Sequence, residues 1–92
     1  MGTLVHRFST MVAVDGLPYA AEVRGDRRED GMWEGRLMFL GGDGTVLVTG
    51  RETTQNSLAA LTYWATGLEP VYLEGALERA RPLSGSLDAD VA

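Results

Sequence analysis

Apolar and polar residues alternate along much of the N-terminal half of the chain. A period of two is typical of strands that bury one face. The alternation predicts four strands, over Thr3–Val14, Tyr19–Arg24, Met32–Leu40 and Thr45–Glu52. Glycine and aspartate gather between them, which indicates short turns. We expect the connection at Asp15–Pro18 to be longer than a two-residue hairpin turn, because proline cannot donate to a ladder.

Residues of the same parity share a face of a strand. The first strand is therefore expected to place Leu4, His6 and Val12 on one face, and the second to turn Glu22 outward.

The third strand is apolar on both parities beyond Leu37. This pattern indicates a segment that is covered on both faces, either as a central strand or at a contact with another chain. Met38 and Leu40 are therefore candidate interface residues.

The stretch Thr53–Leu68 changes to a helical period. Its apolar residues follow one face of a helix, at Leu58, Leu61, Ala65 and Leu68. Several polar residues at its start can cap the helix, and the pattern does not choose among them. Gly67 occupies the position at which a left-handed residue commonly ends a helix.

A second helix is predicted from Pro70 to Ala80. Proline fits the first helical turn, and Pro82 stops the helix at its other end. Eleven residues, 82–92, follow this point and are expected to form a flexible tail.

The first helix carries no ionised side chain. Ordinary surface helices place charge on the face turned to water. Here Ala59, Ala60 and Tyr63 point away from the apolar stripe. We therefore expect the helix to be covered on two sides, by the sheet and by the second helix, a partner chain, or both.

Together these elements predict an α+β fold, with a four-stranded antiparallel meander sheet followed by two helices packed on one face. Residues 1–81 form a single domain in this interpretation, and residues 82–92 are its tail.

Composition removes several functional classes. The chain has no cysteine, so disulfides, thiolate metal sites and thiol catalysis are excluded. No apolar run is long enough to cross a membrane, and the N-terminus lacks the apolar centre of a secretory signal, so a cytoplasmic location is expected. The formal charge of −5 disfavours nucleic acid as a partner.

The residues suited to chemistry give no catalytic, cofactor or metal set. His6 is the single histidine, and a half-buried strand position explains it better than a catalytic role. Glu74 and Glu78 share a helix face without a histidine, which is typical of a solvated face. The glycines of Gly41–Gly44 lack the spacing of a phosphate-binding loop and indicate a turn.

Charged residues on the strands favour a structural explanation. Glu22 and Glu34 share outward parities with Arg24 and Arg36, and cross-strand ion contacts are expected if these strands pair.

Aromatic residues on the helices give the clearest sign of an interaction, since tyrosine and tryptophan are enriched in interfaces. They are Tyr63, Trp64 and Tyr72. Packing between the two helices of one chain explains them equally well, so both alternatives stay open.

Three stretches resemble the HicB-like antitoxin family in their layout. They are YAAEV at Tyr19–Val23, DGMWEG at Asp30–Gly35 and TGRETTQNSLAAL at Thr49–Leu61. The family's Pro-Asp-Leu-Pro-Gly turn is replaced by MFLGGDG, and no DNA-binding module follows. The resemblance implies a small sheet-and-helix module that self-associates, binds a partner protein and has no enzymatic activity.

The sequence thus favours a small non-catalytic protein that assembles with itself, as a dimer or higher oligomer, and serves protein interaction or regulation. One alternative is a ligand-binding or enzymatic domain with a site between protomers, for which His6, Trp33, Glu34 and Arg36 are the candidates. Another is an RNA-binding sheet that uses Arg24, Arg27 and Arg28.

Overall fold

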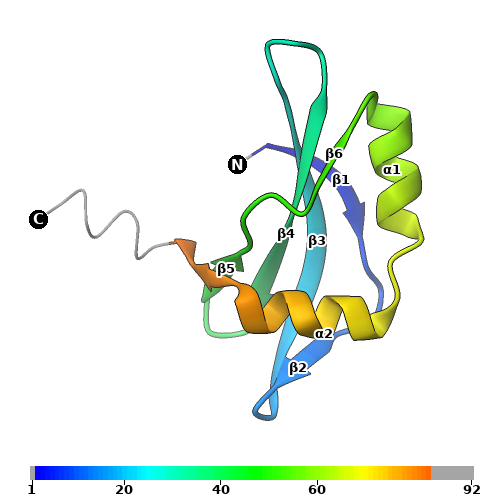
Figure 1. The fold of residues 1–92 in the computed structure, drawn as a ribbon. Helices are drawn as coiled ribbons and strands as arrows, with labels where there is room; N and C mark the ends of the chain where they lie inside the picture. The colour runs from blue at the N-terminus through cyan, green and yellow to red at the C-terminus, as the bar shows by residue number, and fades with distance from the viewer. Residues whose placement is uncertain (1, 84–92) are drawn as a thin grey trace, which may run out of the picture.

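The α+β fold is confirmed by a computed structural model, which describes residues 2–83 (Figure 1). The strands are β1 (Thr3–Arg7), β2 (Val12–Val14), β3 (Leu17–Arg27), β4 (Trp33–Gly41), β5 (Val46–Val48), β6 (Thr53–Gln55) and β7 (Arg81–Pro82), and the helices are α1 (Leu58–Thr66) and α2 (Pro70–Arg79). Every strand pair is antiparallel and all belong to one sheet. Within residues 2–83 the sheet has seven strands rather than the predicted four.

The long hairpin of β3 and β4 is the centre of the sheet. Its register runs from the Tyr19–Gly41 pair to the Arg27–Trp33 pair without a break. On one side β3 pairs with β1 and β2, and on the other β4 pairs with β5 and β6 (Figure 1).

The predicted first strand is two strands, because this edge has more residues than β3 can pair. Arg7 lies opposite Glu22 and Val12 lies opposite Tyr19, so four residues of the edge face two of β3. Residues 8–11 therefore bend away and separate β1 from β2.

A smaller irregularity inside β1 changes the face of its first residues. Leu4 lies opposite Arg24, whereas His6 lies opposite Val23, so one extra residue is accommodated between them. Val23 is fully buried against the helices, and Arg24 lies on the other face. Leu4 and His6 therefore do not share a face, which corrects the prediction from parity.

The predicted fourth strand is interrupted in the same way. Val48 pairs with Met38 and Thr53 with Gly35, which again leaves four residues opposite two. The break is held by Thr49, whose buried hydroxyl accepts the Leu37 amide at 3.0 Å in place of a backbone carbonyl. Residues 53–55, which we expected to lead into the first helix, form β6 instead.

The turn between β2 and β3 is the two-residue Asp15–Gly16, with φ of 52° and 78°. Positive φ at both positions suits the tight hairpin turn that Asp-Gly favours. The longer loop that we predicted is wrong, because Pro18 is tolerated: alternation points its nitrogen toward β4, whose ladder has already ended at the Tyr19–Gly41 pair.

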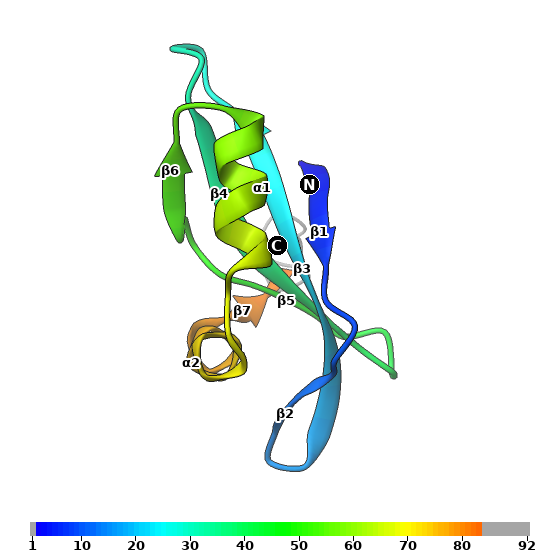
Figure 2. The ribbon, with the colours of Figure 1, turned by 90° about the vertical axis from the view of Figure 1, so that its right-hand side faces the viewer.

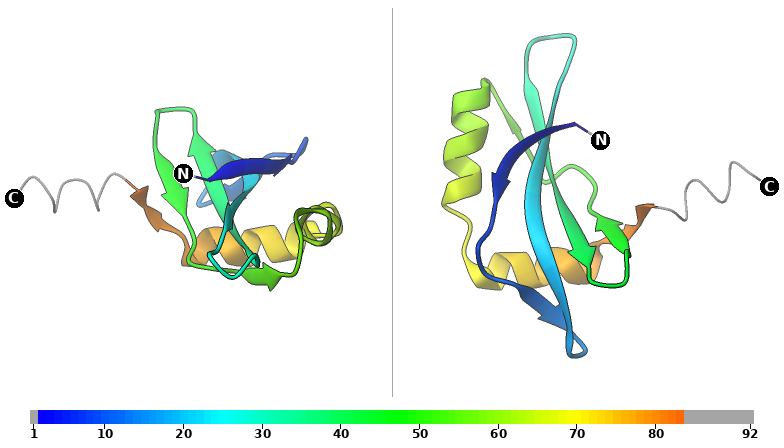
Figure 3. Two further views of the ribbon diagram at one scale, coloured as in Figure 1. Left: turned by 90° about the horizontal axis from the view of Figure 1, so that it is seen from above. Right: turned by 180° about the vertical axis from the view of Figure 1, so that it is seen from behind.

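Both helices pack on one face of the sheet and lie crosswise to each other (Figures 1 and 2). Seen from behind, the strands pass in front of α2 (Figure 3, right). The core between the layers contains the buried side chains Val12, Tyr19, Ala21, Val23, Leu37, Phe39, Ala65, Leu73, Ala76, Leu77 and Ala80. The opposite face of the sheet, which we call the outer sheet face, has no helix on it within residues 2–83.

After α2 the chain returns to the sheet. Arg81 and Pro82 form β7 and pair with Val48 and Leu47 of β5. Pro82, which we placed at the start of the tail, is thus paired in the sheet, and the rest of the predicted tail from residue 84 to residue 92 lies outside the described part of the chain.

Candidate interaction surface

The inner side of α1 is set into the sheet at a pair of facing glycines. Gly25 of β3 and Gly35 of β4 lie opposite each other, and Leu61 rests on both. A β-carbon on Gly25 would lie 2.7 Å from Leu61 Cδ2, and one on Gly35 would lie 2.6 Å from Leu61 Cδ1. Because neither glycine has a side chain, the helix approaches the sheet closely and Leu61 is fully buried.

The ends of α1 are defined locally. Ser57 is the cap, since its hydroxyl accepts the Ala60 amide at 3.0 Å. Gly67 ends the helix with φ of −92°, so the left-handed conformation that we predicted there is wrong. The Gly67 amide instead donates to the Trp64 carbonyl at 3.2 Å, which closes the last turn with right-handed geometry.

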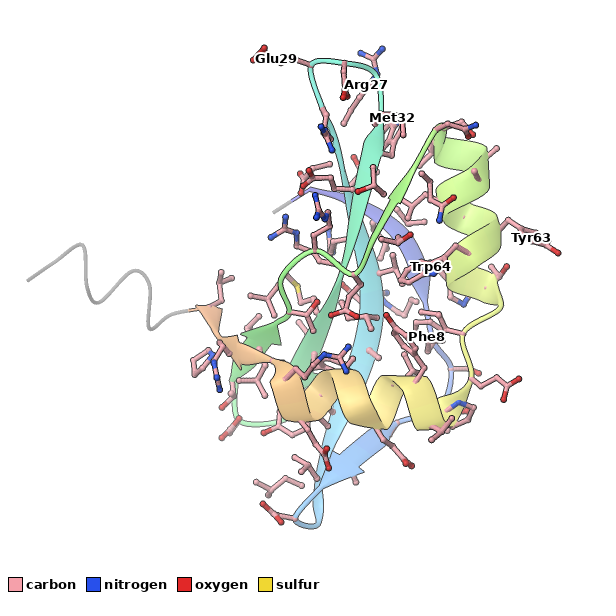
Figure 4. The ribbon with its side chains drawn as sticks, in the orientation of Figure 1. Phe8, Arg27, Glu29, Met32, Tyr63 and Trp64 are labelled. Carbon is pink, nitrogen blue, oxygen red and sulfur yellow. The ribbon has the colours of Figure 1, made fainter. Side chains whose placement is uncertain are left out.

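The other side of α1 is open. It consists of Ala59, Thr62, Tyr63 and Thr66, which we call the outer α1 face, and it is bordered by Leu58, which belongs to the predicted apolar stripe. Tyr63 is 84% exposed and Leu58 41% exposed, and Figure 4 shows Tyr63 pointing away from the sheet. The second helix does not cover this face within residues 2–83, so of the alternatives expected for this side the partner chain stays a prediction.

The polar groups of the outer α1 face are largely satisfied within the helix. Thr62 donates to the Leu58 carbonyl at 2.9 Å, and Thr66 donates to the Tyr63 carbonyl at 3.1 Å. Their hydroxyls therefore need no solvent partner. The face can lose water at a low energetic cost, except at the Tyr63 hydroxyl.

The other aromatic candidates belong to the interior of this chain. Trp64 and Tyr72 meet edge to face, with ring centroids 6.1 Å apart, and both are half-buried against the core. For Trp64 and Tyr72 the structure thus shows packing within one chain, which was one of the two alternatives left open by the sequence. Met38 is buried and Leu40 is half-buried, and the pairing of β4 gives both the parity of the outer sheet face.

Tyr72 also joins α2 to the loop before β6. Its hydroxyl donates to Glu52 Oε1 at 2.5 Å, and Arg79 Nη2 donates to the same oxygen at 2.7 Å. The Arg79 guanidinium lies 5.9 Å from the Tyr72 ring centroid. Burial, followed by the hydrogen bond to Glu52 and its negative charge, raises the pKa of Tyr72 to about 12. The cluster fixes α2 against the sheet.

The outer sheet face contains a buried carboxylate. Glu22 is 3% exposed although its parity is outward, which corrects the expectation that it faces water. Arg7 binds Glu22 Oε2 at 2.7 Å, and Arg24 binds Oε1 at 2.9 Å. Burial opposes the charge of Glu22, but the hydrogen bonds from the two arginines outweigh it and hold its pKa below the ordinary value.

The strand register determines the other charge contacts on this face. It places Arg24 opposite Arg36 and Asp26 opposite Glu34, so like charges face each other. The predicted ion contacts between the two strands are not found among these four residues, and Glu22 binds Arg24 and Glu34 binds Arg36 along single strands instead. Arg36 Nε is buried without a hydrogen-bond partner among the described residues, and Asp26 Oδ2 is 3.9 Å away.

The four candidate ligand residues are not brought together. Glu34 and Arg36 lie on the outer sheet face, whereas Trp33 lies on the helix side, against Gly25. His6 lies on the helix side near α2, where it lines a cavity of about 420 Å³.

Two of the three arginines considered for RNA binding are paired with acidic residues. Arg24 is paired with Glu22, and Arg28 with Asp30 and Glu34. Arg27 lies at the exposed end of the β3–β4 hairpin (Figure 4).

Among residues 2–83 no helix has the length and apolar character required to cross a membrane. The same residues hold no group of three or more histidine, cysteine or acidic side chains placed to bind a metal ion.

An α+β fold with an antiparallel sheet and two helices is thus the class that the architecture defines. Comparisons with protein-family models, with curated proteins and with solved structures give no match to this chain. The HicB-like resemblance therefore stays a prediction.

Sequence reasoning missed three functional or structural positions. Gly25 falls just beyond the predicted second strand and Gly35 lies inside the predicted third, and the role of both depends on the register that places them opposite each other. Glu52 was assigned to a strand, and nothing local indicates that two residues of a later helix bind it.

Proposed function

We propose that this protein is a non-catalytic interaction module that self-associates through the outer α1 face, with α1 packed against α1 of a second copy. One observation carries the proposal. A complete helix side, from Leu58 to Thr66, lacks an ionised group while it exposes a leucine and a tyrosine. The HicB-like resemblance leads to the same expectation of a self-associating regulatory module that also binds another protein.

Charge supports a second copy as the occupant. Two chains of formal charge −5 repel each other at most orientations. A symmetric contact brings the same patch of both copies together, so any charge on the patch would meet itself. The outer α1 face is free of charge and avoids this repulsion.

The shape of the face supports the same arrangement. Helices pack with their axes about 8–10 Å apart when the residues between them are small. Ala59 offers such a position one turn before Tyr63, and Thr62 and Thr66 need no water. In an antiparallel pair, the Tyr63 ring of each copy would cover Ala59 of the other and contribute apolar burial.

Sedimentation equilibrium over micromolar to near-millimolar concentrations tests the proposal. We expect a mass above the 9.9 kDa of one chain, rising with concentration. Tyr63→Arg should return the protein to one chain, because the substitution places like charges at the contact. Its stability should stay within about 0.5 kcal/mol, as expected at an exposed position.

Val71→Glu is the matched control. Val71 is 72% exposed and lies on α2, outside the outer α1 face. It should leave association unchanged. A wild-type protein that stays a single chain at every concentration would refute self-association, and loss of association in Val71→Glu with retention in Tyr63→Arg would place the contact elsewhere.

A further inference from the structure

The cavity beside His6 lies where the edge of the sheet is interrupted. It is bordered by the bend between β1 and β2 and by the chain that leads from α1 into α2. Its lining consists of His6, Arg7, Phe8, Ser9, Thr10, Leu68, Pro70 and Leu73. Its volume of about 420 Å³ falls within the range of small-molecule sites, about 300–1,000 Å³.

Three polar side chains line this cavity without a hydrogen-bond partner in the described chain. They are His6, Ser9 and Thr10, none of which takes part in a side-chain hydrogen bond found among residues 2–83. Ser9 and Thr10 belong to the bend between β1 and β2, where the edge has more residues than β3 can pair. They therefore lie outside the strand ladder. Their hydroxyls are free to donate to a bound molecule.

Apart from Arg7, the remaining lining is apolar, and one of its residues packs against His6. Phe8 meets the imidazole edge to face, with centroids 4.6 Å apart and an interplanar angle of 89°. Leu68 lies in the connection between α1 and α2 and is half-buried, and Leu73 lies on α2 and is buried. A bound ligand would therefore contact apolar side chains on one side and hydrogen-bond donors on the other.

Charge defines the polar end of that ligand. The lining residues include one imidazole and no acidic residue, in a chain of formal charge −5. The Arg7 guanidinium is bound to Glu22 on the outer sheet face, so the hydrogen bonds to a ligand are left to His6, Ser9 and Thr10. Glu74 lines the adjoining hollow, which shares Thr10, Pro70 and Leu73 with the cavity, and would repel an anion from that side.

We propose that this cavity binds a small carboxylate with an apolar body, such as an aryl or short alkyl acid. The carboxylate accepts hydrogen bonds from His6, Ser9 and Thr10, and the hydrocarbon part packs on Phe8, Leu68 and Leu73. The site lies within one chain and does not depend on self-association.

Titration of the full chain with benzoate, followed by amide shifts in ¹H–¹⁵N NMR spectra, tests the site. We expect shifts that saturate at millimolar benzoate and are largest at Ser9 and Thr10. Benzamide and benzylamine share the ring but lack the carboxylate, so they should bind at least tenfold more weakly. Binding of either probe as tightly as benzoate would overturn the assigned class, and absence of saturable shifts with benzoate would overturn the site.

Variants link the binding to the named groups. His6→Ala should weaken benzoate about tenfold, which is the effect of losing one charge-assisted hydrogen bond. Thr10→Val and Ser9→Ala remove hydroxyls at exposed positions that tolerate substitution, so they provide the same test if His6→Ala does not fold. Unchanged affinity in all the folded variants would refute the proposal.

Tyr63→Arg separates this inference from the proposed function. It should abolish association and leave benzoate binding intact, because Tyr63 does not line the cavity. Loss of benzoate binding in a folded Tyr63→Arg protein would show that the site needs a second copy and would overturn its assignment to one chain.

Discussion

The close approach of α1 to the sheet gives the sharpest test of the fold, through the substitution Gly35→Ala. A methyl group on Gly35 would lie 2.6 Å from Leu61 Cδ1 and 3.1 Å from Thr53 Cγ2. Leu61 cannot swing away, because it is fully buried and its other methyl already lies close to Gly25. Overpacking of this kind costs about 1–3 kcal/mol of the free energy of unfolding.

The second variant of the test is Leu61→Ala. Alone it should cost about 2–5 kcal/mol, through lost burial and the cavity that remains. Combined with Gly35→Ala it should cost less than the sum, because the new methyl occupies part of the space that Leu61 leaves. We expect a coupling free energy of about 1–2 kcal/mol, within the range of side chains in contact.

Urea unfolding of the four proteins, followed by circular dichroism, measures the cycle. All samples need one protein concentration, since an associating protein gains stability as concentration rises. Gly50→Ala is the matched control, because its φ is not positive and no atom lies within 4 Å of the added β-carbon. Additivity of Gly35→Ala and Leu61→Ala, or a neutral effect of Gly35→Ala, would refute the assigned helix–sheet contact.

Two further predictions concern the buried ionisable clusters. Because the pKa of Glu22 is lowered in the folded state, the unfolded chain takes up the proton first, and stability falls as the pH drops below the ordinary value of 4.5. Glu22→Gln should cost about 1–3 kcal/mol at neutral pH and flatten this acid-side dependence, as measured by urea unfolding at several pH values. Because the pKa of Tyr72 is raised from 10.0 to about 12, its contribution to stability is full below pH 10 and is lost as the pH rises toward 12. Tyr72→Phe should remove that alkaline loss in the same assay, and a wild-type protein equally stable at pH 9 and pH 12 would contradict the assignment.

The strands and helices were predictable where residue type and period agree. Tyr19, Ala21 and Val23 are buried as their parity indicates, and α2 begins at Pro70 as its first-turn proline predicts. Residue type and period are enough to predict these elements, because their apolar residues all pack into one continuous core.

The interruptions of the two flanking strands were not predictable from periodicity. Each break has four residues opposite two, a surplus that exists only relative to the neighbouring strand. The pattern from Thr3 to Val14 keeps alternating across the bend, so it carries no mark of the change. The candidate cavity is a direct consequence of this surplus, which explains why sequence reasoning found His6 without its setting.

The contacts between charged residues were not predictable from the sequence, for a related reason. Parity correctly placed Glu22, Arg24 and Arg36 away from the core, but it does not give the register. The register sets like charges opposite each other and leaves Arg36 Nε without a hydrogen bond in the described chain. Glu22 is buried because the long side chains of its own neighbours cover it, which no pattern of single positions expresses.

The contact of α1 with the glycine pair also fixes the position of the outer α1 face. Leu61 is locked against Gly25 and Gly35, and Tyr63 follows it on the opposite side of the helix. A helix that is held this firmly presents its outer residues in a fixed arrangement, so association loses little conformational freedom. Gly35→Ala should therefore weaken association as well as stability, whereas Tyr63→Arg weakens association alone. This difference would connect the close approach of α1 to the surface that it exposes.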